Sequence, residues 1–238
     1  DMHPIAAMML FGMDETLVRK MKNGATPEQK AVLDKLLALN PDDAPLDSNE
    51  LSSLRDVIED NFLEQKEFDR IEKMLMGTDF PWFYNPDIDE ISDVGKFQFV
   101  HLFYQDGVSQ HYHVSTSDRI KMLTPIIQAL QPFSIWRVKA NLLTKTSTIV
   151  ENKFHVDLSV DLNRSQALPK EKLKQWTTSI FYINTNNGYT KFETGETVES
   201  IKNRMISFPS HLRHTGTSCT DTRTRVVINF NYYTLFEN

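Results

Sequence analysis

Residues 153–162, KFHVDLSVDL, carry an imidazole and a carboxylate two positions apart. Their neighbours are mostly apolar or β-branched, a composition typical of a β-strand. Successive side chains of a strand point to opposite sides, so His155 and Asp157 would share one face while the apolar residues share the other. The segment is therefore predicted to be a strand with one apolar face and one face that can bind a metal ion.

Two further histidines and an arginine occur near the end of the chain. His211 and His214 follow a predicted strand that ends at Pro209, and Arg225 lies early in the last predicted strand. Two histidines and one carboxylate leave three positions open around a metal, as in non-haem Fe(II) oxygenases. A dicarboxylate co-substrate could take two positions and O₂ the third, while an arginine binds the far carboxylate through paired hydrogen bonds.

Other residues compete for these roles. His211 could replace His214, and Arg223 shares a predicted face with Arg225. The histidines at 111 and 113 repeat the same spacing and could form a second metal site, but no partner strand with a carboxylate is evident. Two strand residues, Arg137 and Lys139, either line the mouth of the barrel or are solvated. Arg223 lies nearer the strand end, which favours Arg225, whereas the residues alone leave the choice between His211 and His214 open.

Composition limits the compartment and the partners. The chain of 238 residues has one cysteine, Cys219, so it cannot form an internal disulfide or a cysteine-based zinc cluster, which favours a cytoplasmic location. A formal net charge of -6 disfavours duplex nucleic acid as a partner. The apolar run at residues 5–13 is too short to span a bilayer and lacks a preceding basic region. Neither a membrane segment nor a signal peptide is expected.

The N-terminal part of the chain is predicted to be helical. Thr26 can cap a helix, with Pro27 in its first position and Gln29 completing a capping box. A stretch rich in Pro, Asp and Asn follows at residues 40–50 and is typical of a linker. We expect a helical arm at residues 1–46 and a second domain at residues 47–238. The arm would cover apolar surface of this chain or of a second copy, so it could support a homodimer.

Strand patterns dominate from residue 96 onward. One helix is predicted before them at residues 64–77, and another from Ser117, in which Pro125 either kinks or restarts the helix. The predicted strands are residues 96–107, 136–143, 154–162, 176–184, 189–193, 203–209 and 224–233. The predicted fold class is mostly β with flanking helices: a double-stranded β-helix, or jelly roll, with helices packed outside.

The order of an H-x-D motif, a distal histidine and an arginine near the start of the last strand resembles the 2-oxoglutarate- and Fe(II)-dependent dioxygenases. The segment TTSIFYINTNNGYTKF resembles their prolyl 4-hydroxylase-like branch, which includes small viral and bacterial members. The resemblance covers about residues 57–233. It implies catalytic iron ligands at His155, Asp157 and His214. It also implies contacts with 2-oxoglutarate at Arg225, Tyr182, Thr190 and Asn141.

The resemblance implies a hydroxylase that uses Fe(II), O₂ and 2-oxoglutarate and releases succinate and CO₂. Ascorbate is a further candidate cofactor. The substrate would be a prolyl peptide or another peptide or small molecule with a reactive C–H bond. Two alternatives stay open: a cupin-like jelly-roll metal enzyme that does not use 2-oxoglutarate, against which Arg225 argues, and a non-catalytic binding module, against which the complete triad argues.

Overall fold

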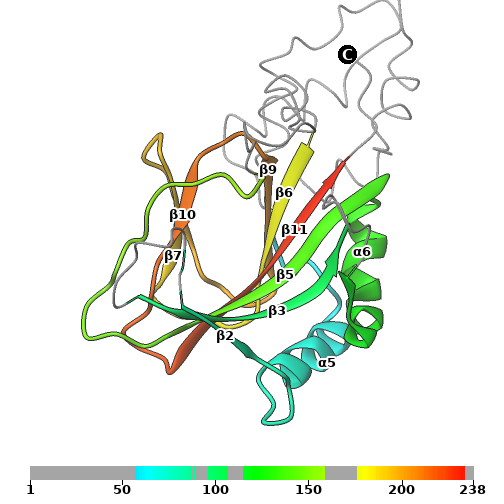
Figure 1. Cartoon of the computed structure of the whole chain (residues 1–238), viewed down its shortest axis with the longest axis horizontal. Helices are drawn as coiled ribbons and strands as arrows, with labels where there is room; N and C mark the ends of the chain where they lie inside the picture. Colours follow the sequence, from blue (N-terminus) through cyan, green and yellow to red (C-terminus); the bar gives the residue numbers. More distant parts are fainter. Residues whose placement is uncertain (1–56, 87, 89–95, 107–114, 159–175, 234–238) are drawn as a thin grey trace, which may run out of the picture.

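The computed structural model describes residues 57–86, 88, 96–106, 115–158 and 176–233. Within these ranges the chain forms two antiparallel sheets that face each other and two α-helices on the outside (Figure 1). The predicted helical arm at residues 1–46 and the histidines at 111 and 113 lie outside the described residues. No helix in the described part of the chain is both long and apolar enough to cross a membrane.

The larger sheet has eight strands in the order β1-β9-β6-β11-β5-β3-β2, with β4 beside β3. Their bounds are β1 Val57–Asp60, β2 Phe83–Asn85, β3 Gln98–Gln105, β4 Ser115–Thr116, β5 Ser134–Thr144, β6 Trp176–Tyr182, β9 Arg204–Pro209 and β11 Thr224–Tyr233. The smaller sheet has the order β10-β7-β8, with β7 Tyr189–Phe192, β8 Thr197–Glu199 and β10 His214–Gly216. This two-sheet arrangement confirms the predicted fold class.

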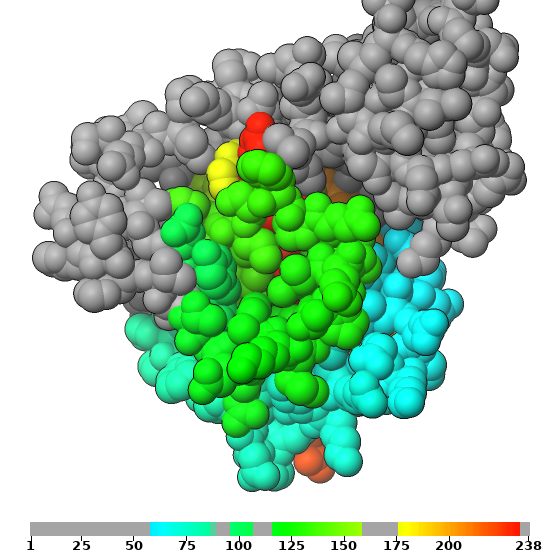
Figure 2. Space-filling view, turned by 90° about the vertical axis from the view of Figure 1, so that its right-hand side faces the viewer, coloured from blue at the N-terminus to red at the C-terminus, as the bar shows by residue number. Residues whose placement is uncertain are grey.

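The two helices cover the outer face of the larger sheet. Helix α5 (Gln65–Leu75) buries Phe68, Ile71 and Leu75 against it, and the short η1 (Asp118–Leu123) leads into α6 (Thr124–Leu130). Figure 2 views this face, where the green residues of η1 and α6 lie beside the cyan residues of α5. Pro125 sits in the first turn of α6, where no backbone N–H is needed, so it restarts the helix and does not kink it.

Alternating side chains of β11 separate the two faces of the larger sheet. Val226, Ile228 and Phe230 lie in the apolar core under the helices. Arg225 and Val227 point to the opposite face and line a pocket between the sheets. The alternation of side chains along a strand is therefore what directs a guanidinium into the interior.

The strand predicted at residues 153–162 is wrong in its described part, residues 153–158. His155 forms only one isolated bridge, in which its N–H donates to the His214 carbonyl at 2.9 Å and its carbonyl accepts from the His214 N–H at 3.0 Å. Side chains also bond to backbone carbonyls here: the Asn152 side-chain amide donates to the Gly216 carbonyl, as the Asn152 backbone N–H does at 3.4 Å, and Arg137 donates to the Asp157 carbonyl. A single β-like pairing is still enough to hold the two imidazoles side by side.

We expect Phe68→Ala to lower the free energy of unfolding by about 3–5 kcal/mol, because it leaves a cavity in the main core. Phe68 is fully buried and packs edge-on against Phe181 of β6, with ring centroids 6.0 Å apart. Denaturant titration measures the change. Lys66→Ala, at an exposed position of the same helix, is the control and should change stability by less than about 0.5 kcal/mol. Equal effects of the two substitutions would contradict the packing described here.

Candidate metal centre

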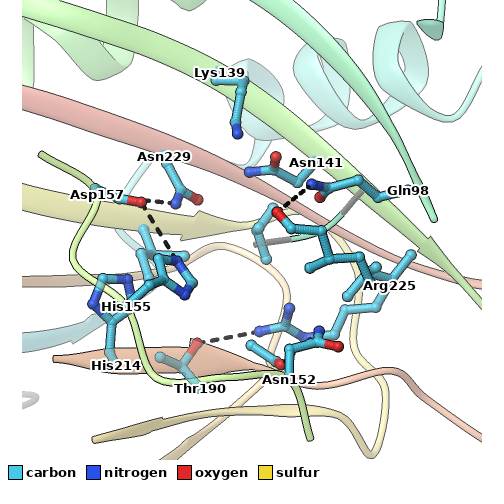
Figure 3. Close-up of a pocket in the computed structure, with 15 residues that line it drawn as sticks. Gln98, Lys139, Asn141, Asn152, His155, Asp157, Thr190, His214, Arg225 and Asn229 are labelled. Carbon is cyan, nitrogen blue, oxygen red and sulfur yellow. Dashed lines mark hydrogen bonds and ion pairs between the residues drawn. The ribbon is translucent and has the colours of Figure 1, made fainter. Parts of the chain in front are cut away.

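Three side chains meet in the space between the two sheets (Figure 3). The ligand atoms of His155, Asp157 and His214 all lie within 4.8 Å of one another. His214 begins β10 and is 2% exposed, the Asp157 side chain is 5% exposed, and His155 is half-buried. Two imidazole nitrogens and one carboxylate oxygen form a donor set that suits a divalent transition metal and leaves other coordination positions open.

Backbone carbonyls orient both imidazoles. The Nδ1 atom of His155 lies 3.1 Å from the Lys153 carbonyl, and that of His214 lies 3.2 Å from the Leu212 carbonyl. A carbonyl can only accept, so Nδ1 carries the proton in each ring and the Nε2 lone pair is left for a metal. Burial lowers the pKa of His214, which favours its neutral, metal-binding form.

The carboxylate of Asp157 is held by residues from two strands of the larger sheet. Its Oδ2 accepts hydrogen bonds from Asn229 at 3.2 Å and Asn231 at 3.0 Å, and its Oδ1 lies 3.4 Å from the Arg137 guanidinium. Burial raises the pKa of Asp157, but the charges of Arg137 and of the two imidazoles, with the Asn231 hydrogen bond, hold it well below its usual range. With Oδ2 occupied by two amides, Oδ1 is the oxygen available to a metal, and it lies 3.8 Å from His155 Nε2.

The far end of the same pocket holds a buried guanidinium. Arg225 is 4% exposed; its Nε donates to the Ser200 hydroxyl at 2.8 Å and its Nη2 to Thr190 at 3.2 Å. Burial lowers the pKa of Arg225, and no carboxylate among the described residues forms an ion pair with it. A buried cation of this kind is destabilising unless it is paired, so this end of the pocket suits an anionic ligand group.

Thr190 and Tyr182 support this guanidinium. The Thr190 oxygen lines the pocket and accepts hydrogen bonds from both Arg225 and the Tyr182 hydroxyl, the latter at 2.7 Å. Tyr182 is fully buried, burial raises its pKa, and its ring lies 5.7 Å from the centre of the guanidinium. The structure thus places Tyr182 behind Thr190, outside the pocket lining, while Thr190 keeps its own O–H for a ligand.

The remaining predicted residues differ in whether they line the pocket. Asn141 lines the pocket from β5, as does Lys139 two positions earlier. His211 is exposed on the turn before β10, and Arg223 is exposed before β11; neither lines the pocket. The structure therefore brings His214 and Arg225, and not their competitors, to the pocket.

Sequence reasoning missed the amides that hold Asp157. Asn229 and Asn231 share the inward face of β11 with Arg225, and polar residues on that face of an otherwise apolar strand were the available signal. The sequence predicts Arg137 to line the mouth of the barrel or to be solvated. It contacts Asp157 because Arg137 and Asn231 are cross-strand partners on β5 and β11.

Comparisons with known proteins agree on the fold. No protein-family model matches the sequence, and no curated protein is similar to it in sequence. A 2OG-Fe(II) oxygenase family oxidoreductase from Burkholderia pseudomallei matches with a TM-score of 0.53 at 11% identity, over 78% of this chain and 87% of that one. HygX from Streptomyces hygroscopicus, solved with nickel and 2-oxoglutarate, matches with a TM-score of 0.50 at 12% identity, over 81% and 89%.

A viral collagen prolyl hydroxylase from Paramecium Bursaria Chlorella virus-1 matches with a TM-score of 0.45 at 13% identity, over 82% of this chain and 97% of that one. The match to the first two structures extends over most of each chain. This chain has the jelly-roll fold of the 2-oxoglutarate- and Fe(II)-dependent oxygenases.

Proposed function

We propose that this protein is a non-haem oxygenase that uses Fe(II), O₂ and 2-oxoglutarate to hydroxylate a C–H bond, with release of succinate and CO₂. The observation that carries the proposal is one pocket with two ends: the group of His155, Asp157 and His214 lies at one end, and the buried Arg225 lies at the other. A dicarboxylate that also chelates a metal matches both ends.

Each pocket residue has a role in this proposal. His155, Asp157 and His214 hold Fe(II), which with O₂ and 2-oxoglutarate supplies the oxidising chemistry. Arg225 and the Thr190 hydroxyl bind the far carboxylate of 2-oxoglutarate, and Tyr182 fixes Thr190 from behind. All three of these residues line the pocket, so a metal that they hold would be accessible from it. Ascorbate would act only by keeping the iron reduced.

The substrate would be a peptide or a small molecule. A prolyl peptide is a candidate through the resemblance of the segment that contains Tyr182 and Thr190 to the prolyl 4-hydroxylase-like branch. The helical arm at residues 1–46, a homodimer formed through it, and a cytoplasmic location remain predictions from the sequence.

Binding measurements test the proposal. Titration calorimetry with Mn(II) as a redox-inert substitute for iron should show that 2-oxoglutarate binds at least about tenfold more tightly to the Mn(II)-loaded protein than to the metal-free protein. Glutarate, which has both carboxylates but no keto group to chelate the metal, is the matched control and should gain little from Mn(II). Equal binding of the two acids, or binding independent of metal, would overturn the proposed role of the pocket.

We expect Gly188→Ala to weaken 2-oxoglutarate binding by about tenfold while Mn(II) binding is retained, since about one charged hydrogen bond would be lost. A methyl group there would lie 2.7 Å from Arg225 Cδ and 2.7 Å from the Ser218 carbonyl, so the arginine must shift. The same titration measures both affinities. Unchanged 2-oxoglutarate affinity would show that the guanidinium is not held by this contact.

A further inference from the structure

Three amide oxygens in the pocket have no hydrogen-bond partner among the described residues. They are the Oδ1 atoms of Asn141, Asn152 and Asn229, all buried, and all three residues line the same pocket. Buried polar atoms are nearly always hydrogen-bonded in folded proteins, because leaving one unpaired is destabilising. Their gathering in one pocket indicates that a bound molecule supplies the donors.

The orientation of Asn229 is fixed by its neighbour. Its Nδ2 donates to Asp157 Oδ2 at 3.2 Å, and the same oxygen also accepts from the Asn231 amide, which holds the Asn229 amide in this orientation. The Oδ1 atom of Asn229 is therefore an acceptor beside the carboxylate of the candidate metal centre. The residue is 8% exposed, which leaves little access to bulk water. Asn141 lies on the adjacent β5, diagonal to Asn229 on the same face, since Asn229 pairs with Lys139 and Val227 pairs with Asn141.

2-Oxoglutarate cannot satisfy the Asn229 oxygen. At neutral pH its two carboxylates and its keto group are all acceptors, so it offers no N–H or O–H. The Asn152 oxygen does not need a donor from a further molecule in the same way. Asn152 donates to the carbonyl of Gly216, and the Arg225 guanidinium lies next to Gly216, so this end of the pocket has hydrogen-bond donors of its own. The Asn229 oxygen, beside the carboxylate of the candidate metal centre, needs a donor from another molecule.

We propose that Asn229, with Asn141 beside it, determines specificity by accepting a hydrogen bond from an N–H or O–H group of the substrate next to the carbon that is hydroxylated. This rests on the proposed function, and it narrows the substrate class. The substrate carries a donor such as a secondary amide or a hydroxyl at that point. A prolyl ring fits poorly, since its tertiary amide nitrogen has no hydrogen.

A pair of small amides tests the inference on the full chain loaded with Mn(II) and 2-oxoglutarate. N-methylacetamide has one N–H, whereas N,N-dimethylacetamide has none and keeps the same carbonyl. The Mn(II)-induced relaxation of their acetyl methyl protons, measured by NMR, reports binding close to the metal. We expect N-methylacetamide to show about two- to tenfold stronger relaxation, the range of one neutral hydrogen bond.

Two variants distinguish the proposed role of Asn229 as a hydrogen-bond acceptor for the substrate from its role in holding the Asp157 carboxylate. Asn229→Leu and Asn231→Leu each remove one amide from Asp157 Oδ2, but the oxygen of Asn231 accepts from Arg137 and Asn231 does not line the pocket. Asn229→Leu should abolish the difference between the two amides, and Asn231→Leu should preserve it.

Several results would overturn the inference. The inference would be overturned if both small amides showed equal relaxation, or if both variants lost the difference between them. Metal-dependent 2-oxoglutarate binding, and with it the proposed function, would still stand. Failure of that binding in the unaltered protein would instead remove the proposed function, and the inference with it. Lys139 lines the same pocket and could itself donate a hydrogen bond to the Asn229 oxygen. The Lys139→Met variant tests this alternative. If this variant gained the discrimination and the unaltered protein lacked it, the lysine would be the donor.

Discussion

Replacing His214 with alanine should lower the affinity for Mn(II) by about two orders of magnitude or more. The imidazole is one of three ligands, and even the loss of a residue that only supports a ligand typically costs 10- to 100-fold. His214 is buried against the Phe208 ring, with centroids 4.8 Å apart, and its Nε2 faces His155 and Asp157. Among the described residues, His214 belongs to the one group of three side chains that could hold a metal. Titration calorimetry with Mn(II) measures the loss.

His211→Ala is the matched control for this experiment. It removes an imidazole three positions away, from an exposed site on the turn, and should leave Mn(II) affinity within about twofold. If His211→Ala abolished metal binding and His214→Ala did not, the exposed His211 would be the metal ligand and His214 would not.

Arg225→Ala is expected to weaken 2-oxoglutarate binding by about one to two orders of magnitude, with Mn(II) affinity largely retained. Hydrogen bonds to a charged group contribute roughly 1.5–3 kcal/mol, which gives this range. Two of the donor nitrogens of Arg225 are held by Ser200 and Thr190, so the guanidinium is already oriented before any ligand arrives. The measurement is a 2-oxoglutarate titration of the Mn(II)-loaded variant.

Arg223→Ala and Arg225→Lys complete the comparison. Arg223 is exposed and lies outside the pocket, so its loss should not change the affinity. Lysine at 225 should restore binding only in part, because an ammonium lacks the planar fork that binds a carboxylate with two hydrogen bonds. If Arg223→Ala weakened 2-oxoglutarate binding as much as Arg225→Ala, the assignment of Arg225 as the carboxylate ligand would be contradicted. If neither substitution had an effect, 2-oxoglutarate would not be the ligand of this pocket.

The sequence predicted the parts of the site that follow from regular strand geometry. Alternation along β11 places Arg225 and Asn229 on the inner face and Ile228 on the outer face, and this needs only the period of two. The amphipathic pattern of α5 was equally readable, because Phe68 and Ile71 repeat at helical spacing.

The parts that depend on contacts between distant segments could not be predicted. Residues 153–158 look like a strand, but only His155 among them forms a bridge, to His214, while the side chains of Arg137 and Arg213 donate to the carbonyls of Asp157 and Phe154. The support of Asp157 likewise requires the register that pairs Arg137 with Asn231, which no local pattern specifies. The hydrogen bond from Tyr182 to Thr190 is a tertiary contact of the same kind.

Formation of succinate from 2-oxoglutarate tests the central claim most directly. The purified protein is mixed with Fe(II) and 2-oxoglutarate, O₂ is admitted, and succinate is quantified with no added substrate. Our account predicts succinate that requires Fe(II) and O₂ together and is lost in both His214→Ala and Arg225→Ala, while His211→Ala retains it. Succinate that forms equally in those two variants, or its absence from a protein that binds Fe(II) and 2-oxoglutarate together, would contradict the claim that this pocket is the active site of a 2-oxoglutarate-dependent oxygenase.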